Sequence, residues 1–351
     1  MAAICAYGFP AKATAGRVHG ETAHPYRNPF QRDRDRIVHC AAFRRLSGKM
    51  QVFTAEFGNY HRTRLTHTLE VACIARTIGR ALGLNEDLIE ASAYLHDIGH
   101  PPFGHTGEDV LNRLLADSGG FEHNAQALRI VEKREQRYAG FPGLNLSREI
   151  LDGQRYKMGT SKTPLLEIQT MDVADSIAYD THDVDDAMEL GLLTAGQVIH
   201  TALWKAAAYR VRQLWTNLDD AEFRRAVIHH LIERQVSNVI ETAKHRLQKI
   251  TSYETALKLP VLIAPSAELA EEKAEMEAFL LAEVYRHPQV TEHRRRVSLW
   301  LETLFRQYVK DGRKLPERYA DVIREEGIER ATADYLADQT DRSVKEQIGG
   351  S

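Results

Sequence analysis

Hydrophobic residues recur at intervals of three and four positions through most of this chain, whereas the strict alternation typical of strands is scarce. The helical repeat is clearest over residues 63–82, 87–98, 222–249 and 266–285. Apolar side chains at this spacing fall on one face of an α-helix, because the helix turns once in about 3.6 residues. The pattern therefore predicts an all-α fold.

Composition limits the class of protein further. With 351 residues, 43% of them hydrophobic, the chain can bury one large core or two smaller ones, and its net charge of −3 argues against a generally nucleic-acid-binding surface. Cys5, Cys40 and Cys73 are too scattered for a disulfide framework, which predicts a cytoplasmic protein. Residues 1–18 lack the apolar run of a secretory signal, and no segment approaches membrane-spanning length.

Three histidines and one aspartate lie within residues 96–105, whose sequence is HDIGHPPFGH. The apolar repeat before this motif predicts a helix whose last turn carries His96 and Asp97, and Gly99 and Pro101 are expected to stop it. Two adjacent side chains at a helix end can converge on one ion. The motif therefore indicates a metal site.

Two further ligand candidates lie on other helical segments. His67 shares a stripe with Val71, so its imidazole should face the core, and Asp175 shares one with Ile168 and Met171. An ionised carboxylate on an apolar stripe is unfavourable unless a cation lies opposite it. Two imidazoles and two carboxylates suit Mn²⁺, Fe²⁺, Ni²⁺, Zn²⁺ or Mg²⁺, and ligand type alone does not choose among them.

Each candidate also has a simpler interpretation. A lone His67 is more often a core histidine than a ligand, and a lone Asp175 is more often a capped or salt-bridged carboxylate. Two inward-facing histidines and two inward-facing carboxylates on three helical segments, including the adjacent His96 and Asp97, favour a metal centre instead.

The order His67, His96, Asp97, Asp175 resembles the H…HD…D signature of HD-domain phosphohydrolases. The flanking sequences resemble those of bacterial deoxyguanosinetriphosphate triphosphohydrolase-like proteins: YRNPFQRDRDRI (26–37), AFRRL (42–46), KMQVF (49–53), RTRLTHTLEV (62–71), FEHN (121–124) and DSIAYDTHDVDD (175–186). The resemblance is dense from residue 26 to residue 186 and thin after it. Residues 334–342, DYLADQTDR, resemble the family's closing motif, but the next two residues depart from its usual Tyr-Ala, and we assign no role to them.

The resemblance implies an HD-domain helical core with additional C-terminal helices. It also implies hydrolysis of dGTP, or of deoxynucleoside triphosphates (dNTPs) in general, to the deoxynucleoside and inorganic triphosphate. On this basis we expect a loose arm at 1–18, an HD core at 19–190 and a C-terminal helical region at 191–351 packed on it as one compact unit. The expected cofactor is Mg²⁺ or Mn²⁺, with Fe²⁺, Ni²⁺, Co²⁺ and Zn²⁺ as alternatives.

This reaction needs a proton donor, because the departing 5′-oxygen is a much worse leaving group than pyrophosphate. His105 is the candidate acid, and Glu108, one turn later, is expected to hold its other nitrogen and keep it protonated. The resemblance assigns acid and base work to these two positions and places His123 near the phosphates. The alternative is that His105 merely caps the helix that begins near Thr106.

A triphosphate also needs fixed cations and a pocket for its nucleoside. Arg64 lies one turn before the first predicted ligand and matches a family phosphate-binding position. Gln51 matches the residue that contacts the sugar and its 3′-hydroxyl. Tyr179 and Asp183 share the helix face of the last predicted ligand, and by resemblance they line the sugar pocket.

Loops are expected at residues 140–143, 153–163 and 259–265, and the middle one, with Lys157 and Lys162, is either a mobile cover over the site or a plain connection. Two other functions stay open: a nucleotide-sensing or single-stranded nucleic-acid-binding HD protein without turnover, and an HD nucleotidase or phosphodiesterase. The acid candidates favour the enzyme. Expected partners are dNTPs as substrate and as allosteric activator, other copies of the chain in a homo-oligomer, and weakly bound single-stranded nucleic acid, with no membrane.

Overall fold

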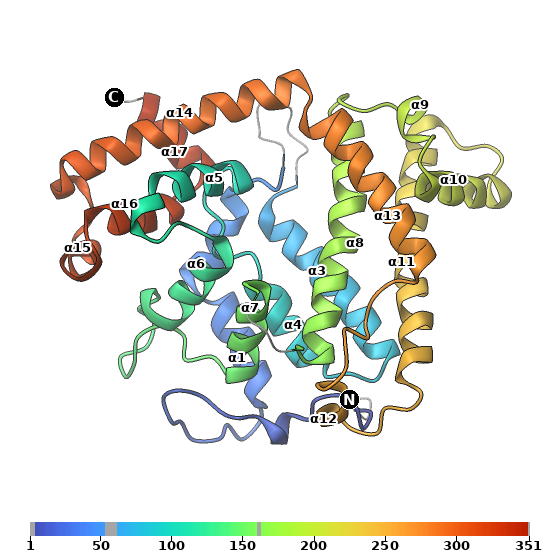
Figure 1. The fold of residues 1–351 in the computed structure, drawn as a ribbon, viewed down its shortest axis with the longest axis horizontal. Coiled ribbons are helices and arrows are strands. Elements are labelled where there is room, and N and C mark those ends of the chain that lie inside the picture. The colour runs from blue at the N-terminus through green and yellow to red at the C-terminus, as the bar shows by residue number, and fades with distance from the viewer. Residues whose placement is uncertain (1–3, 53–61, 160–162, 350–351) are drawn as a thin grey trace.

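Helices build almost the whole of the computed structural model, which describes residues 4–52, 62–159 and 163–349 (Figure 1). Within these residues the only strand-like pairings outside helices are three isolated bridges, so the all-α prediction is confirmed. The α-helices are α1 Pro29–Val38, α2 Ala41–Arg45, α3 Arg64–Ala81, α4 Glu86–Leu95, α5 Gly104–Leu114, α6 His123–Arg129, α7 Arg148–Lys157, α8 Leu166–Glu189, α9 Ala195–Val198, α10 Ala202–Leu214, α11 Asp220–Leu247, α12 Tyr253–Ala256, α13 Ala267–Leu280, α14 Pro288–Lys310, α15 Ala320–Glu326, α16 Ile328–Ala337 and α17 Asp341–Gly349. Two π-helical turns, η5 Ile130–Arg134 and η6 Leu281–Tyr285, follow α6 and α13.

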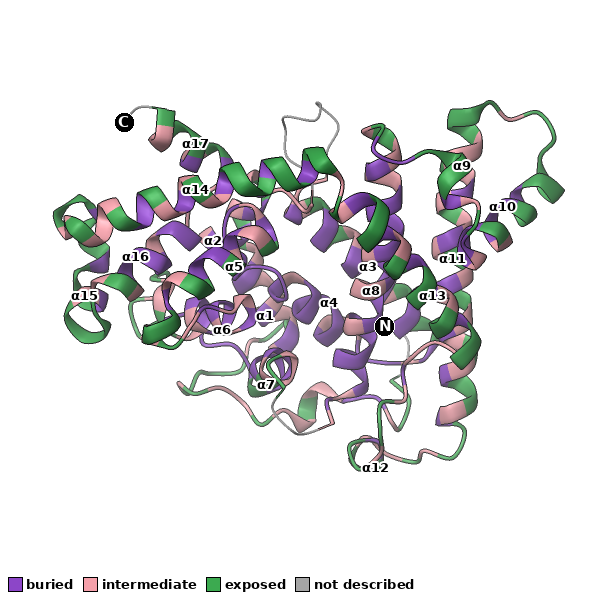
Figure 2. Cartoon of the chain, turned by 45° about the horizontal axis from the view of Figure 1, so that its top comes forward, coloured by how far each residue is buried: buried purple, intermediate pink, exposed green. Residues whose placement is uncertain are grey.

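The centre of the molecule is formed by α3, α4 and α8, which pack against one another (Figure 1). Their shared core includes Val71, Ile78, Ile89 and Met171, each at most 2% exposed. Figure 2 shows buried residues concentrated on these inner helices, whereas the outward face of α14 is exposed. Because these three helices carry the predicted ligands on their inward faces, the core itself brings the ligands together.

The start of α3 follows from its sequence. Thr63 precedes the helix in an extended conformation, and its side chain accepts a hydrogen bond from the Thr66 N–H at 3.2 Å. The Thr66 hydroxyl accepts in return from the Thr63 N–H at 3.0 Å. This reciprocal capping satisfies two backbone donors that the first turn leaves unpaired. It places the helix that carries His67 in a defined register.

The end of α4 differs slightly from the prediction. The helix stops at Leu95, so His96 and Asp97 lie just beyond it and not on its last turn. The chain turns at Gly99, where an added Cβ would lie 2.0 Å from the His123 carbonyl oxygen. Close packing of this motif against α6 therefore ends the helix earlier than the apolar repeat indicates.

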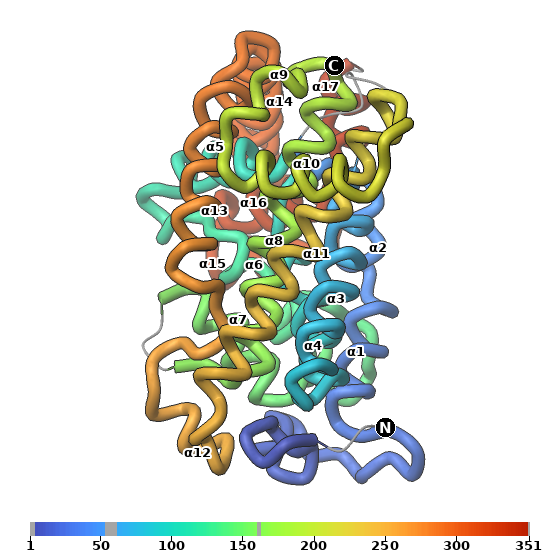
Figure 3. Tube along the Cα trace, turned by 90° about the vertical axis from the view of Figure 1, so that its right-hand side faces the viewer, coloured from blue at the N-terminus to red at the C-terminus, as the bar shows by residue number. Residues whose placement is uncertain are grey.

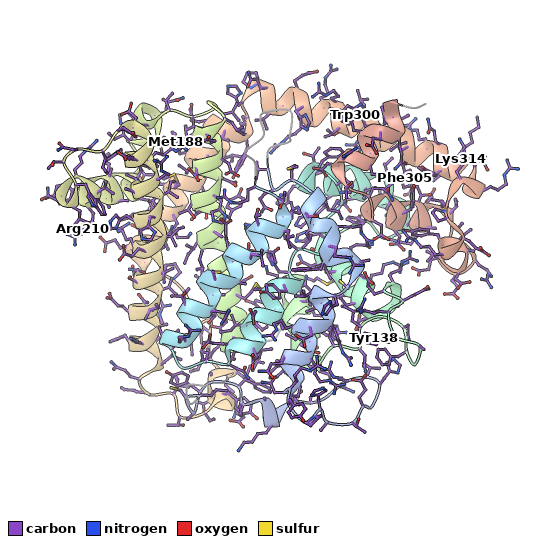
Figure 4. All side chains as sticks on the ribbon, turned by 180° about the vertical axis from the view of Figure 1, so that it is seen from behind. Tyr138, Met188, Arg210, Trp300, Phe305 and Lys314 are labelled. Atoms are coloured by element: carbon purple, nitrogen blue, oxygen red, sulfur yellow. The ribbon has the colours of Figure 1, made fainter. Side chains whose placement is uncertain are left out.

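The C-terminal helices form two groups around this centre. On one side, α10, α11 and α13 share a core with the end of α8, and Figure 3 shows α11 and α13 running beside it. On the other side, α14, α16 and α17 pack on α5. Figure 4 labels Trp300 and Phe305 on α14, and both belong to this second cluster. Every helix among the described residues is too short or too polar to cross a membrane.

The first described residues contact the ends of α4 and α8. The Phe9 N–H donates to Glu167 Oε1 at 2.8 Å, and Asn85 Nδ2 donates to the Phe9 carbonyl at 2.8 Å. The Phe9 ring also lies 5.0 Å from that of Tyr253 at the start of α12. The division into segments 1–18, 19–190 and 191–351 stays a prediction.

The expected loop at 153–163 is wrong over its first part, because α7 continues to Lys157. Gly153 is a packing residue in this helix: an added Cβ would lie 2.5 Å from Ile168 Cδ1 on α8. The remainder of the predicted cover includes Lys162, which lies outside the described residues. Residues 140–143 and 259–265 are not helical, as expected.

Candidate active site

Three of the four predicted metal ligands converge. One ligand atom each of His67 on α3, His96 after α4 and Asp175 on α8 lies within 4.8 Å of the other two. Asp175 Oδ1 is 3.1 Å from His67 Nε2 and 3.6 Å from His96 Nε2. Both histidines are buried, whereas the Asp175 side chain is 28% exposed, so the group can be reached from outside.

Asp97 lies beside this group. Its Oδ1 is 3.5 Å from His96 Nε2 and 3.3 Å from His100 Nε2, and its Oδ2 accepts from Arg64 Nη1 at 2.8 Å. Burial would raise the pKa of Asp97, but the neighbouring His96 and Arg64 outweigh it and hold that pKa well below the usual range. Asp97 is therefore an ionised carboxylate at neutral pH, as a metal ligand has to be.

The histidines present the chemistry that a divalent ion requires. His96 Nδ1 donates to the Ala93 carbonyl oxygen at 2.6 Å, so Nε2 is the nitrogen that can bind an ion once it has given up its proton. This Nε2 is buried and finds no hydrogen-bond partner among the described residues. A buried imidazole nitrogen facing two carboxylates fits a divalent cation, and the residues present therefore suit the predicted metal.

Lys157 is part of this centre, and the sequence reasoning did not identify it. Its Nζ lies 3.2 Å from Asp175 Oδ2 and 3.2 Å from Asp172 Oδ1. Burial would raise the pKa of Asp175, but the charges of Lys157 and His96 lower it strongly. In the sequence, Lys157 was only one basic residue in an expected loop.

A second cluster lies next to the first and consists of His100, Glu108 and His123. The His123 Nδ1–H donates to Glu108 at 2.9 Å, and the backbone N–H of His123 donates to the same carboxylate at 2.8 Å. The rings of His100 and His123 stack with their centroids 3.9 Å apart. Burial and the charge of Arg64 hold the pKa of His100 well below its usual range, so this imidazole is neutral.

His105 occupies the first turn of α5, and two expectations about it are wrong. Glu108 pairs with His123 instead of His105, because the start of α6 brings the His123 backbone onto the carboxylate. The His105 ring is not kept protonated, since desolvation and the charge of Arg64 lower its pKa. Nor does His105 cap α5, because the helix begins at Gly104 with Phe103 as its N-cap.

The turn before α5 brings Arg64 close to His105. Phe103 and Gly104 both have a left-handed backbone, with φ of 62° and 56°. A Cβ on Gly104 would lie 2.5 Å from Arg64 Nη2, so only glycine admits the guanidinium here. Arg64 is 1% exposed, and its Nε and Nη2 find no hydrogen-bond partner among the described residues. Unpaired donors on a buried guanidinium suit a phosphate oxygen.

A cavity of about 300 Å³ opens beside His105. Residues that line it come from both halves of the chain and include Gln51, His105, Tyr179, Tyr285, His293 and Arg294. Asp183 lies behind this lining: it is 1% exposed, and its carboxylate accepts a hydrogen bond from the Tyr285 hydroxyl. The structure thus brings Gln51 and Tyr179 to one cavity and puts Asp183 beneath it.

The C-terminal motif at 334–342 is hydrogen-bonded to the chain around residues 49–50 and 100–103. Asp341 accepts from the backbone N–H groups of Met50 and Phe103, at 3.0 and 2.9 Å. Lys49 Nζ donates to the carbonyl oxygens of His100 and Ala337, at 2.7 Å each. No role was predicted for this motif from the sequence, although its similarity to the family's closing motif could have indicated that it packs near the site.

The sequence of this chain is similar to those of known proteins over almost its whole length. The model of the HD domain family matches residues 64–180, and that of the phosphohydrolase-associated domain matches residues 263–348. Deoxyguanosinetriphosphate triphosphohydrolase-like proteins of Geobacter metallireducens and Geobacter sulfurreducens are 41% and 40% identical to this chain, each over 97% of it and 93% of their own length. The protein of the same name from Leptospira interrogans is 39% identical over 97% of this chain and 93% of its own. A crystal structure of a hypothetical protein from Aquifex aeolicus is similar with a TM-score of 0.34 and 19% identity, over 74% of this chain and 69% of that one.

Proposed function

The chain belongs to the family of HD-domain deoxyguanosinetriphosphate triphosphohydrolase-like proteins, and we propose that it hydrolyses dGTP or other dNTPs to the deoxynucleoside and inorganic triphosphate. A phosphohydrolase function follows from that family, whereas the substrate and the bond that is cleaved are the proposal. The observation that carries it is the position of Arg64. Its Nη1 donates to Asp97, and its unpaired Nη2 is buried beside Gly104, the residue before the candidate acid His105, where a phosphate would need it.

His67, His96, Asp97 and Asp175 are the residues proposed to hold the divalent ion. Mg²⁺ and Mn²⁺ are the first candidates, followed by Fe²⁺, Ni²⁺, Co²⁺ and Zn²⁺. When bound, such an ion supplies Lewis-acid chemistry at a phosphate oxygen and favours deprotonation of water.

His105 acts as the general acid in this proposal. Water attacks the α-phosphorus, the bond from that phosphorus to the 5′-oxygen breaks, and the His105 proton passes to the departing oxygen, while the attacking water gives up one proton to solvent as the new phosphate oxygen ionises. The lowered pKa of His105 in the free protein is consistent with this role, because a bound triphosphate places negative charge beside the ring and raises that pKa. Substrate binding therefore charges the acid that the reaction uses.

His123 and Glu108 support the phosphate end of the site. The carboxylate of Glu108 accepts a hydrogen bond from His123 Nδ1 and so fixes the ring, which leaves Nε2 as the nitrogen proposed to contact a phosphate oxygen. Gln51 and Tyr179 line the cavity next to His105 and are the proposed contacts of the sugar.

The proposal extends to partners and location. dNTPs are the substrates and, at a second site, activators; the chain forms a homo-oligomer; and the three free cysteines fit a reducing cytoplasm. The alternatives are a nucleotide sensor or single-strand binder without turnover, and a nucleotidase or phosphodiesterase.

Phosphorus NMR of the products tests the reaction. The purified chain is incubated with each dNTP, alone and mixed, first with Mg²⁺ and then with Mn²⁺. Inorganic triphosphate with free deoxynucleoside is expected. Pyrophosphate with monophosphate, or consumption of monophosphates, would replace the proposal by the nucleotidase alternative. Saturable binding without any product would replace it by the sensor.

A further inference from the structure

Lys157 is the last residue of α7 and lies against the candidate metal centre. Gly153 lets α7 approach α8 closely, since an added Cβ there would lie 2.5 Å from Ile168 Cδ1. The ammonium group thereby reaches two carboxylates on α8: its Nζ is 3.2 Å from Asp175 Oδ2 and 3.2 Å from Asp172 Oδ1. A positive charge is thus fixed beside a proposed metal ligand, where it repels an incoming cation.

The two proposed carboxylate ligands divide their oxygens in the same way. Asp97 Oδ2 accepts a hydrogen bond from Arg64 Nη1 at 2.8 Å. Asp175 Oδ2 accepts one from Lys157 Nζ at 3.2 Å. The other oxygen of each carboxylate lies near His96, whose Nε2 is 3.5 Å from Asp97 Oδ1 and 3.6 Å from Asp175 Oδ1. Each carboxylate therefore contacts a protein cation with one oxygen and has the other directed at the candidate metal centre.

The charges of these four side chains cancel. Histidines that bind a metal ion are neutral, so the formal charge comes from the two carboxylates and from the cations Arg64 and Lys157. Asp172 adds a further negative charge, but its side chain is 43% exposed and water screens it. A divalent ion therefore gains no net attraction from the four charges, whereas the same set without Lys157 would carry one negative charge.

Lys157 has two opposing effects on an ion, and their sizes can be compared. As a charge it disfavours a cation: a unit charge about 6 Å from a divalent ion changes the binding constant about tenfold even at the dielectric constant of water, and more at the lower effective values within proteins. As a donor it orders Asp175, and loss of that order costs about fivefold or less in affinity. His67 Nε2, 3.1 Å from Asp175 Oδ1, also orders this side chain. Repulsion is therefore the larger effect.

We propose that Lys157 is a positioning residue that restricts Asp175 to binding the ion through Oδ1 and lowers the affinity of the free protein for divalent cations. The inference rests on the ligand set of the proposed function and deepens it, because it assigns control of metal binding to a residue of α7. With the ion bound, the centre has an excess of positive charge, which favours an anionic phosphate. Metal ion and phosphate should therefore bind more tightly together than apart.

The test measures Mn²⁺ binding to the full chain after treatment with EDTA and its removal, without nucleotide, from the electron paramagnetic resonance signal of the free ion. Lys157→Met removes the charge and keeps most of the alkyl stem. Its dissociation constant for Mn²⁺ should be about tenfold or more below that of the wild type. A merely structural lysine predicts the opposite, because loss of its contacts would loosen the site and weaken binding.

Competition by Ca²⁺ and Mg²⁺ tests the restriction to a single oxygen. Ca²⁺ readily takes both oxygens of a carboxylate, whereas Mg²⁺ demands a near-ideal octahedron and keeps several waters. The affinity of each ion is obtained from its displacement of Mn²⁺. The gain in Lys157→Met should be several times larger for Ca²⁺ than for Mg²⁺, because Asp175 Oδ2 becomes available. Equal gains for the two ions would overturn the restriction.

Three further variants separate the charge of Lys157 from its effect on folding. Lys157→Arg keeps the positive charge and should bind Mn²⁺ as weakly as the wild type. Lys244→Met, at an exposed lysine on α11, makes the same change in net charge and should leave the affinity unchanged. Asp172→Asn tests the inference even if Lys157→Met does not fold. It removes a charge that partly offsets Lys157 and should weaken Mn²⁺ binding several-fold.

An unchanged or weaker affinity for Mn²⁺ in folded Lys157→Met overturns the inference, and so does a gain that Lys157→Arg shares or tighter binding in Asp172→Asn. Absence of Mn²⁺ binding from both the wild type and Lys157→Met overturns it together with the proposed ligand set. Failure of the proposed reaction has a different signature, because it appears only in the products formed from dNTPs and leaves the Mn²⁺ titrations as they are.

Discussion

Glu108 accepts hydrogen bonds from both the backbone N–H and the ring Nδ1–H of His123, at 2.8 and 2.9 Å. One carboxylate on α5 thereby fixes the start of α6 and the orientation of its first side chain. The same bonds lower the pKa of Glu108 despite its burial, so the carboxylate stays ionised. Glu108 therefore pairs with His123 and not with His105, which precedes it by one helical turn.

Glu108→Gln should reduce kcat for triphosphate release by about 100-fold, because a neutral amide accepts the two hydrogen bonds of His123 more weakly than a carboxylate does and so loosens the orientation of that ring. The fold should persist in circular dichroism. Asp109→Asn is the control, since Asp109 is exposed on the same helix. Turnover within about twofold of the wild type would show that the pair has no part in the chemistry.

The pH profile should report the lowered pKa of His105. The reaction needs the protonated ring, so kcat/KM, which reflects the free protein, should fall as the pH rises through a pKa below the ordinary 6.5. Bound triphosphate raises that pKa, so the corresponding fall in kcat should occur at higher pH. In His105→Asn, neither kcat/KM nor kcat should show this fall. If kcat and kcat/KM fell at the same pH, the proposal that bound substrate raises the pKa of His105 would be contradicted.

Removal of a ligand should abolish both metal binding and turnover. A divalent ion that binds only the folded chain stabilises it by about 2.7 kcal/mol at a hundred times its dissociation constant. We therefore expect Mn²⁺ to raise the melting temperature of the EDTA-treated wild type. His96→Ala should show no such rise, whereas His229→Ala, a change at an exposed histidine on α11, should respond like the wild type. A full metal response in His96→Ala would exclude this ligand set.

Gly99→Ala should damage the site through packing. The new methyl group would lie 2.0 Å from the His123 carbonyl oxygen and 2.4 Å from the Ala127 nitrogen, so α6 must move away from the metal-binding loop. The expected loss is about 3 kcal/mol, the upper end of the usual cost of overpacking, in the free energy of unfolding by urea, together with most turnover. Gly140→Ala provides the comparison, because a Cβ there meets nothing within 4 Å. Equal stability of the two variants would refute the packing argument.

Lys49→Met should remove a pH dependence of stability. Burial lowers the pKa of Lys49 to about 7 in the folded chain, against 10.5 for an exposed lysine. Between these values the unfolded chain binds the proton and the folded chain does not, so rising pH favours folding by about 1.4 kcal/mol per unit. Urea unfolding from pH 7 to 10 should show the wild type gaining stability relative to Lys49→Met. Lys133→Met, at an exposed lysine on η5, serves as the control. Parallel curves for the wild type and Lys49→Met would contradict the lowered pKa.

Much of the candidate metal centre could be predicted from the sequence because its proposed ligands lie on inward helix faces. His67 and Asp175 shared stripes with apolar residues, and burial of those stripes is what brings the two side chains within 3.1 Å of each other. The helical fold class followed from the same periodicity. The resemblance to the family supplied proposed roles for the remaining residues, and those roles stay predictions.

The pairing of side chains was harder to predict than their identity. Glu108 was expected to serve His105, its neighbour on the helix, but α6 presents His123 with two donors to the same carboxylate. Lys157 was assigned to a loop, whereas Gly153 lets α7 pack closely on α8 and continue as far as the lysine. Both outcomes depend on the close approach of helices that are separate in the sequence.

The sequence by itself therefore determined the all-α class, the family and the residues that converge on the candidate metal centre, because helical periodicity and local motifs act over a few turns. Only the tertiary structure decided which partner each of these residues has. Tyr285 meets Asp183, and Lys49 joins His100 to Ala337, through contacts between residues far apart in the chain. Such contacts follow from how whole helices pack, and the local pattern of residues does not predict that packing.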